Sequence, residues 1–334
     1  MSDTVEIALA SDEKYFCGLL VTAASIAKFA NPNAVLSFNI LDGGIQDKDY
    51  AYLISCVTSI NPKSTFTRHK LNLENPNLSK VPAYLGNKMT YARLLLPAML
   101  HDCDFVIYSD IDILWLADIE RVWKLRSPTC SYISSQDSCK GTLEMEKRWF
   151  NEHGLAFCVD NYFCAGFSLI NLQYFQEHDI SKRVFDFLQK HKTTNCADQT
   201  GLNAVLGSKV QLLQRNWQLF PRNGIMESDI ESQVLIHYAG ETPWKASKQT
   251  HLLTDTQLLW FRFDAHVRGI SLWQSLRMHY SSWKIVLWRT IFGAISCGLG
   301  NRLFRYYMHR TGRGCFNERL SAKTIKTFSQ RLDA

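Results

Sequence analysis

The strongest constraint on the fold is the regular alternation of strand-like and helix-like segments near the N-terminus. Apolar or alternating runs at residues 5–10, 35–41 and 65–70 are typical of strands. Between them, residues 18–30 and 46–59 have helical spacing. This β-α-β-α-β order predicts an α/β fold with a mostly parallel central sheet, right-handed crossovers and helices on its faces. In such folds, ligands bind beyond the carboxyl ends of the strands.

The run DFVIYSDIDILW, residues 104–115, marks one such strand end. Asp110 and Asp112 follow its apolar part and, two residues apart on an extended chain, point to the same side. The same spacing occurs twice more, at Asp47/Asp49 and Asp102/Asp104. The first of these pairs lies at a predicted helix start and the second precedes the strand, so neither ends a buried run. The sequence therefore predicts a metal site at Asp110 and Asp112.

The size and cysteine content fit a large intracellular protein. With 334 residues and 46% hydrophobic residues, the chain can build one large domain or a domain with an appendage. The ten cysteines are scattered singly without a CxxC pair, which favours reduced thiols over a zinc site or a disulfide framework. Residues 1–11 have neither a basic nor a long apolar region, so no secretory signal or anchor is predicted and we expect a cytoplasmic location.

The net charge of +6 is distributed unevenly. From Arg262 to Ala334 there are 13 Lys and Arg residues against 3 Asp and Glu, a net charge of +10, which leaves −4 for the first 261 residues. Such an acidic body with a basic tail argues against a nucleic-acid partner and for attachment to a membrane surface or a protein. We therefore expect a catalytic or binding domain at residues 1–260 and a basic, aromatic, helical tail at 261–334.

The tail has an interfacial composition. Aromatic and basic residues alternate between residues 272 and 313, and the apolar run 285–299 contains Arg289. This run is shorter than the roughly 20 residues that cross a bilayer, so a spanning helix is not expected. Aromatic side chains at headgroup depth and cations on anionic lipid would instead hold the tail on the surface. The alternative is a helical cap packed on the main domain, with its cations in solvent.

Six segments together resemble one family. They are, in order, IALASDEKYFCGLLVTAASI, MTYARLLLP, YSDIDILW, YFCAGFSLINL, ADQTGLNAVL and IHYAGETPWK. Over about residues 5–250 the chain resembles glycosyltransferase family 8, in particular the bacterial lipopolysaccharide and lipooligosaccharide galactosyl- and glucosyltransferases. The resemblance implies a nucleotide-diphospho-sugar transferase fold of the GT-A type. It also implies a reaction that retains the configuration of the donor sugar.

The resemblance also implies roles for individual residues. Asp110, Asp112 and His237 are expected to bind a divalent cation, Mn²⁺ or else Mg²⁺, and Asp198 and Gln199 to lie beside the reacting sugar. The residues expected to bind the UDP-sugar donor are Asp12, Arg93, Asp110, Ile111, Asp112, Ala165, Gly240 and Lys245. Gly166, Trp244 and Asp137 are weaker candidates, because glycines often only form turns and large aromatic residues often only fill the core.

The chemistry agrees with these roles but leaves the mechanism open. A departing nucleoside diphosphate needs nearby positive charge, which a cation can supply. Glutamine is a poor nucleophile, so we favour a same-face displacement at the sugar carbon near Gln199, while a covalent route stays open. An alternative role for Asp198 is to cap the helix at Gln199. Cys164 replaces the usual asparagine. The lysine normally found before Pro-Trp is missing, and Lys245, Arg93 or Lys248 could make its phosphate contact instead.

The predicted function is therefore transfer of a hexose, galactose first and glucose next, from a UDP-sugar to the lipid-linked core oligosaccharide of lipopolysaccharide. The enzyme would lie on the inner face of the bacterial inner membrane. One alternative is a sugar-nucleotide hydrolase or a nucleotidyltransferase that uses the same acidic site. The other is a membrane-associated binding protein that has lost catalysis through Cys164 and the missing lysine.

Overall fold

The computed structural model describes residues 3–72, 74–84, 86–214, 217–221, 235–240, 242–248, 255–279, 330 and 332. The chain forms two compact units, residues 1–218 and 219–334. The boundary predicted from charge, at residue 260, separates a domain from a tail that are expected to differ in function, and it stays a prediction. The strand β9, Gln218–Leu219, lies at the boundary between the units.

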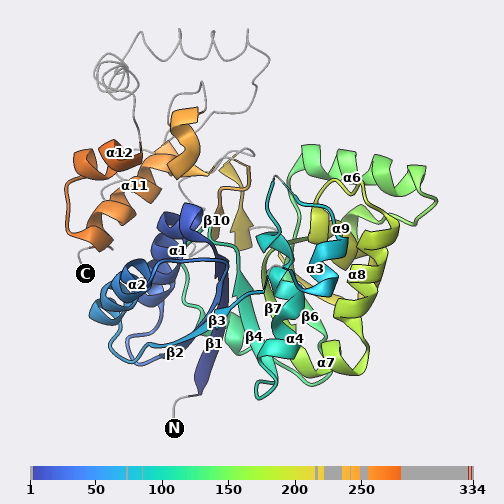
Figure 1. Ribbon diagram of the computed structural model, residues 1–334, viewed down its shortest axis with the longest axis horizontal. Coiled ribbons are helices and arrows are strands. Elements are labelled where there is room, and N and C mark those ends of the chain that lie inside the picture. The colour runs from blue at the N-terminus through green and yellow to red at the C-terminus, as the bar shows by residue number, and fades with distance from the viewer. Residues whose placement is uncertain are drawn as a thin grey trace, which may run out of the picture. The chain divides into compact units, whose positions relative to one another are not determined.

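The first unit is built on a seven-stranded sheet (Figure 1). Its strands are β1 Thr4–Ser11, β2 Val35–Asp42, β3 Thr65–Lys70, β4 Phe105–Ser109, β6 Tyr132–Gln136, β7 Phe163–Asn171 and β8 Val210–Leu213. The spatial order is β3-β2-β1-β4-β7-β6-β8. Strand β7 runs antiparallel to both of its neighbours, and the other pairs are parallel. The expected α/β fold with a mostly parallel sheet is confirmed.

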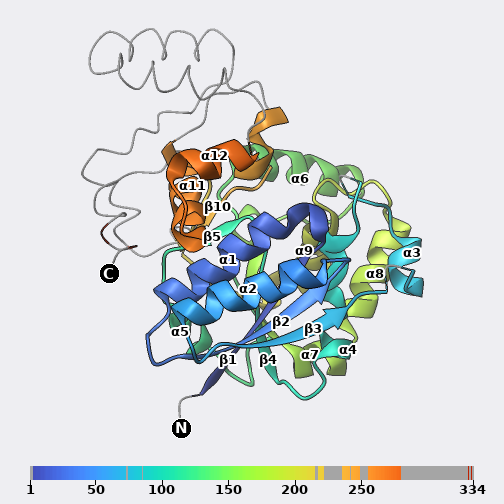
Figure 2. The same ribbon diagram turned by 60° about the vertical axis from the view of Figure 1, so that its left-hand side comes forward.

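Helices cover this sheet. The α-helices of the first unit are α1 Phe16–Phe29, α2 Asp47–Ile60, α3 Pro76–Lys80, α4 Leu96–Met99, α5 Glu120–Trp123, α6 Lys140–Glu152, α7 Leu172–Glu177, α8 Ile180–Lys190 and α9 Ala197–Leu206. Figure 2 shows α1 and α2 side by side over the strands β1 to β3. Helices α7, α8 and α9 contribute to a core cluster that includes Ala8, Ala10, Val106 and Tyr108. These are alternate residues of β1 and β4, as expected where one face of a sheet is buried.

Residues 91–100 have helical spacing in the sequence but do not form one continuous α-helix. Residues Met89–Leu95 form a 3-10 helix, η2, and α4 follows from Leu96. Pro97 explains the break, because proline has no N–H and its ring clashes with the carbonyl four residues earlier in an α-helix. That carbonyl belongs to Arg93, and it accepts a hydrogen bond from the N–H of Leu96 instead.

The second unit contains β10 Leu235–His237, the 3-10 helix η7 Pro243–Lys248, α11 Asp255–Arg268 and α12 Leu272–His279. Asp264 joins α11 to α12: its carboxylate pairs with Arg268 at 2.6 Å and accepts from the Ser275 hydroxyl at 2.5 Å. Among the helices that the structure describes, none has both the length and the apolarity to span a bilayer. The predicted interfacial segment beyond His279 lies outside the described residues, and of the rest of the tail only residues 330 and 332 are described.

Candidate active site

The Asp110 and Asp112 loop begins where β4 ends, between the parallel strand β1 and the antiparallel strand β7. The N–H of Asp110 donates to the carbonyl of Gly166 at 2.6 Å, which ties the loop to β7. The chain turns back into β5, Ile113–Trp115, directly after Asp112. One carboxylate oxygen from each aspartate lies within 4.8 Å of the other, and both residues are half-buried. Two carboxylates at this separation fit a hard divalent cation that takes oxygen ligands.

Helix α1 holds this loop through its backbone. The Thr22 hydroxyl lies 2.8 Å from the carbonyl oxygens of both Ile111 and Ile113, on either side of Asp112. Three residues further along α1, the Ser25 hydroxyl accepts from the N–H of Trp115 at 3.1 Å. The loop backbone is therefore fixed by groups that leave the two carboxylates out of these bonds.

Arg93 connects the loop to other polar groups of the unit. Only 3% of its side chain is exposed. It pairs with Asp110 at 2.7 Å through Nη2 and with Asp198 at 2.7 Å through Nε, and it donates to the carbonyl of Ala165. Its guanidinium also lies over the Tyr108 ring, with Cζ 4.2 Å from the ring centroid. Burial alone would lower the pKa of Arg93, but the two carboxylates outweigh burial and raise it, so the side chain is charged.

Asp198 is 2% exposed and lies in the first turn of α9. Its Oδ1 accepts from the Thr90 hydroxyl at 2.5 Å, while Oδ2 faces Arg93. Cys196 takes the N-cap position of α9 and makes no side-chain cap. These contacts give Asp198 a tertiary role beyond the helix cap considered from sequence. Its expected contact with the sugar stays a prediction.

The side-chain amide of Gln199 is held by three partners. Its Oε1 accepts from the N–H of Ala165 at 2.9 Å. Its Nε2 lies 3.1 Å from Asp137 Oδ2 and 3.4 Å from the Tyr162 hydroxyl. Because a backbone N–H can only donate, the contact with Ala165 fixes which end of the amide is oxygen. The Asp137 carboxylate, whose Oδ1 accepts from the N–H of Cys139 at 2.8 Å, agrees with that orientation.

Cys164, at the position where asparagine was expected, is buried within the first unit. Its sulfur accepts from the N–H of Gly166 at 3.5 Å and from Nε2 of Gln218 at 3.3 Å. The Gln218 side chain in turn accepts from the Ser135 hydroxyl at 2.8 Å. Cys164 is thus joined to a buried polar chain that links β7 to β6 and to the end of the unit. The cysteines among the described residues form no disulfide, as expected for reduced thiols.

The remaining predicted donor residues are distributed over both units. In the first, Asp12 accepts from the N–H of Tyr15 at 3.1 Å and from the Asn87 amide at 2.8 Å. In the second, Gly240 has φ +72°, a conformation that favours glycine. His237 is 4% exposed, and Lys245 lies in η7.

Trp244, also in the second unit, packs on the ring of Trp260 with centroids 5.3 Å apart. It is 7% exposed, which agrees with the core role considered for it.

Comparison with known proteins identifies the family. The model of "Glycosyl transferase family 8" matches residues 6–248, most of the chain. The chain belongs to glycosyl transferase family 8. A probable galacturonosyltransferase-like protein of Arabidopsis thaliana is 23% identical over 261 residues, which cover 72% of this chain and 71% of that protein. The lipopolysaccharide 1,3-galactosyltransferase of Salmonella typhimurium is also 23% identical, over 73% of this chain and 74% of the relative.

Solved structures of glycosyltransferases share the fold. A complex of the galactosyltransferase LgtC with donor and acceptor sugar analogs matches with a TM-score of 0.62 and 24% identity, covering 80% of this chain and 96% of that one. The bifunctional glycosyltransferase WbbM matches with a TM-score of 0.67 and 18% identity over 84% of this chain. This chain spans 52% of the WbbM chain, about half. The GT-A type of fold predicted from the family 8 segments is confirmed.

The sequence did not single out four polar residues around these groups, Thr22, Thr90, Tyr162 and Glu146. The first two carry hydroxyls inside apolar helices, which composition does not distinguish from ordinary buried threonines. Glu146 had a detectable pattern, because it lies three and four residues before Trp149 and Phe150 and so shares their face of α6. A carboxylate on an apolar face of a helix indicates a buried partner.

Proposed function

We propose that this chain transfers a hexose from a UDP-sugar, galactose first and glucose next, with retention of configuration. Membership of family 8 supports glycosyl transfer as the reaction class. The observation that carries the proposal is the pair of half-buried carboxylates, Asp110 and Asp112, at the end of a central strand. Arg93 joins this pair to Asp198, one residue from Gln199, so the two groups that the reaction needs belong to one connected arrangement.

We propose that Asp110 and Asp112, with His237 as a third ligand, hold Mn²⁺ or else Mg²⁺. The support is the donor set, two carboxylates and an imidazole, together with their order in the family segments. Bound there, the cation would neutralise the charge that develops on the departing diphosphate. Asp12, Ile111, Ala165, Gly240 and Lys245 would contribute the remaining donor contacts, as the resemblance implies.

At the sugar, the amide of Gln199 would stabilise the positive charge that builds on the reacting carbon. A carbonyl oxygen can do this electrostatically without forming a bond. A same-face displacement then remains the preferred mechanism, because glutamine is a poor nucleophile. Asp198, already paired with Arg93 and Thr90, would act by placing sugar hydroxyls.

The proposed acceptor is the lipid-linked core oligosaccharide of lipopolysaccharide, met at the inner face of the bacterial inner membrane. The name of the Salmonella relative supports this acceptor class. The outer face of α12 supports a membrane location, because Trp273 and Met278 are 41% and 58% exposed beside the exposed Arg277. Sedimentation with anionic but not with zwitterionic vesicles, weakened by salt, would support the location. Equal recovery with both would contradict it.

The function is tested by measuring UDP release from UDP-galactose, UDP-glucose and UDP-galacturonate with purified protein, with Mn²⁺, with Mg²⁺ and with a chelator. Each donor is assayed alone and with truncated core oligosaccharide, and the anomer of the product is read by NMR. Metal-dependent glycoside formation is expected. UDP release without glycoside would indicate a hydrolase, and donor binding without turnover would indicate a binding protein.

A matched control separates the metal site from other acidic pairs. Asp102 and Asp104 have the same spacing as Asp110 and Asp112 but precede the strand, and the Asp102 side chain is 89% exposed. Asp102→Asn should therefore keep the metal response that Asp112→Asn loses. Equal loss in both variants would contradict the assignment of the cation to Asp110 and Asp112.

A further inference from the structure

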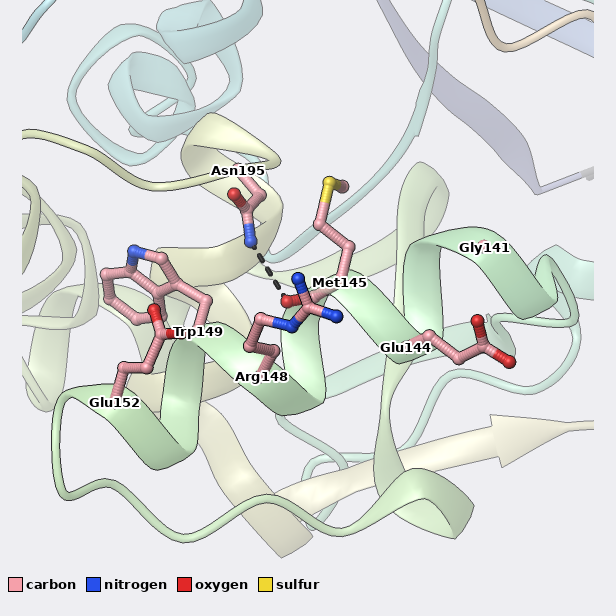
Figure 3. Close-up of a pocket in the computed structure, with 7 residues that line it drawn as sticks. All are labelled: Gly141, Glu144, Met145, Arg148, Trp149, Glu152 and Asn195. Atoms are coloured by element: carbon pink, nitrogen blue, oxygen red, sulfur yellow. Dashed lines mark hydrogen bonds between the residues drawn. The ribbon is translucent and has the colours of Figure 1, made fainter.

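Glu146 is a fully buried carboxyl group on a helix whose other acidic residues are accessible. Its exposed fraction is 0%, whereas Glu144 and Glu152 of the same helix are exposed. The helix has two different faces. A pocket of about 350 Å³ lies on one face (Figure 3) and is lined by Gly141, Glu144, Met145, Arg148, Trp149, Glu152 and Asn195. Glu146 does not line this pocket, and burying a carboxyl group costs several kcal/mol unless it is well paired.

The partner of Glu146 leads to Gln199. The Tyr162 hydroxyl lies 2.8 Å from Glu146 Oε2 and 3.4 Å from Gln199 Nε2. A tyrosine hydroxyl has one proton, and Nε2 of an amide can only donate. The Tyr162 hydroxyl therefore accepts a hydrogen bond from Gln199 and donates one to Glu146. The order of donation runs in one direction, from Gln199 to Tyr162 to Glu146.

This direction determines what the Gln199 amide can offer. Nε2 carries two hydrogens and has two acceptors within hydrogen-bond distance, Asp137 Oδ2 and the Tyr162 hydroxyl. On the other side, Oε1 accepts from Ala165 and has a second lone pair, for which the described residues provide no hydrogen-bond donor. An amide held in this way presents oxygen, and not N–H, to a bound sugar.

We propose that Glu146 and Tyr162 are positioning residues: Tyr162, oriented by Glu146, accepts from one N–H of the Gln199 amide while Asp137 accepts from the other, so that the carbonyl oxygen of Gln199 faces the reacting sugar. The inference rests on the proposed transferase function and extends it to two residues outside the donor site. Glu146 acts only through Tyr162, and Tyr162 acts only through Gln199.

The protonation of Glu146 is compatible with this arrangement. Burial raises its pKa, against the effect of Tyr162 and of the nearby Thr200, Asn195 and Cys196. The second oxygen, Oε1, has no hydrogen bond of good geometry in the structure, so a proton can reside there. In either state Oε2 accepts from Tyr162, and the direction of donation does not change.

The first test compares kcat among variants that differ in the acceptor offered to Tyr162. Tyr162→Phe and Glu146→Leu should each lower kcat roughly tenfold with little change in the donor KM, the loss of one positioning hydrogen bond. Glu146→Gln keeps a carbonyl acceptor of the same shape and should recover most of the activity. Tyr132→Phe removes another buried hydroxyl, one without a hydrogen bond of good geometry, and serves as the control.

The second test asks whether the effect passes through Gln199. In a Gln199→Ala background, Tyr162→Phe should cause almost no further loss of kcat, because the amide that it positions is gone. Losses that multiply in the double variant would overturn the inference and leave Glu146 and Tyr162 as packing residues. Thermal unfolding of each variant separates this result from poor folding.

A third measurement does not depend on turnover. In protein labelled with ¹⁵N at glutamine side chains, the Gln199 NH₂ signals are identified by their loss in Gln199→Ala. Tyr162→Phe should shift them and speed their exchange with water, and Tyr132→Phe should not. Unmoved signals would overturn the inference even if the wild type transfers sugar. If no donor is turned over but the signals shift, the contact stands and the proposed function fails.

Discussion

The Asp110–Asp112 loop and the Gln199 amide are held in place by different means. The loop is fixed through its backbone, with Thr22 of α1 beside two of its carbonyls and Gly166 of β7 accepting from an N–H. The amide is fixed through its own side-chain atoms by Ala165, Asp137 and Tyr162. A loop fixed through its backbone can bring its carboxylates together without using them to hold the loop, although one oxygen of Asp110 also pairs with Arg93. A group fixed through its side chain can offer a ligand only those hydrogen-bonding positions that its protein partners do not use.

The difference predicts different responses to substitution. Replacing Asp112 should remove a proposed ligand and hardly disturb the fold, whereas changes around the amide should alter its orientation. Arg93 lies between the two cases, because it is buried and joins Asp110 to Asp198. Four substitutions, in order of decreasing expected effect, test this contrast.

Asp112→Asn should have the largest effect. It removes one anionic ligand from the proposed cation site, and we expect kcat/KM to fall by about 10²–10³-fold, as for loss of one electrostatic contact in a transition state. The free energy of unfolding should change little, because Asp112 is half-buried and the loop is held by its backbone. The measurement is UDP release at saturating Mn²⁺, together with urea unfolding. A large loss of stability would mean that the carboxylate supports the fold.

Arg93→Met should act mainly on stability. It leaves Asp198, which is 2% exposed, without its counter-charge, and we expect the free energy of unfolding to fall by about 3 kcal/mol. Urea denaturation measures this change. Lys182→Met, which breaks a solvent-exposed pair with Asp186, is the control and should have no measurable effect. Equal effects of the two variants would contradict the buried pairing of Arg93.

Thr22→Val should loosen the loop without touching a carboxylate. The carbonyls of Ile111 and Ile113 lose the hydroxyl that both face, which should cost about 1–2 kcal/mol of unfolding free energy. The loop aspartates would then be less well placed, so half-saturation by Mn²⁺ should require a higher concentration. Thr58→Val is the control, because that hydroxyl bonds a carbonyl within α2. An unchanged Mn²⁺ concentration at half-saturation would show that the hydrogen bonds from Thr22 to the loop backbone do not affect cation binding.

Glu146→Gln should have the smallest effect, seen as a dependence on pH. Burial raises the pKa of Glu146, so the native state binds this proton more tightly than the unfolded state, where the value is 4.5. The resulting stability is fully present below that value and is lost as the pH rises through the raised native pKa. Wild type should therefore lose stability relative to Glu146→Gln with rising pH, as measured by urea unfolding at a series of pH values. A relative gain would mean that Glu146 stabilises as a carboxylate.

Local patterns were sufficient to predict much of the fold. The order of the first strands and helices follows from periodicity, and α2 begins at Asp47 with both aspartates of its triplet in the first turn, as predicted. The strand before Asp110 was evident from its apolar run. The direction of β7 was not, because a nine-residue buried strand has the same composition whether it runs parallel or antiparallel.

The polar contacts of the site required the tertiary structure. Thr90 and Asp198 are 108 residues apart in sequence, and Asp137 and Gln199 are 62 apart. No local spacing brings such residues together. Family resemblance indicated Arg93, Asp198 and Gln199 but not Thr90, which bonds Asp198, or Tyr162, which contacts Gln199. Glu146 is the exception that a helical pattern could have revealed.

Ala165 gives the contrast a mechanical consequence. Its N–H holds the Gln199 amide, and its carbonyl accepts from Arg93, which pairs with Asp110. The groups on the leaving-group side and on the sugar side of the proposed reaction are thus hydrogen-bonded to the backbone N–H and C=O of one residue. The distance between these two backbone atoms is fixed by covalent geometry, and no side-chain substitution can change it. Mutations that change donor preference should therefore succeed where they leave the distance between Gln199 and the Arg93–Asp110 pair unchanged, and fail where they require these groups to move apart.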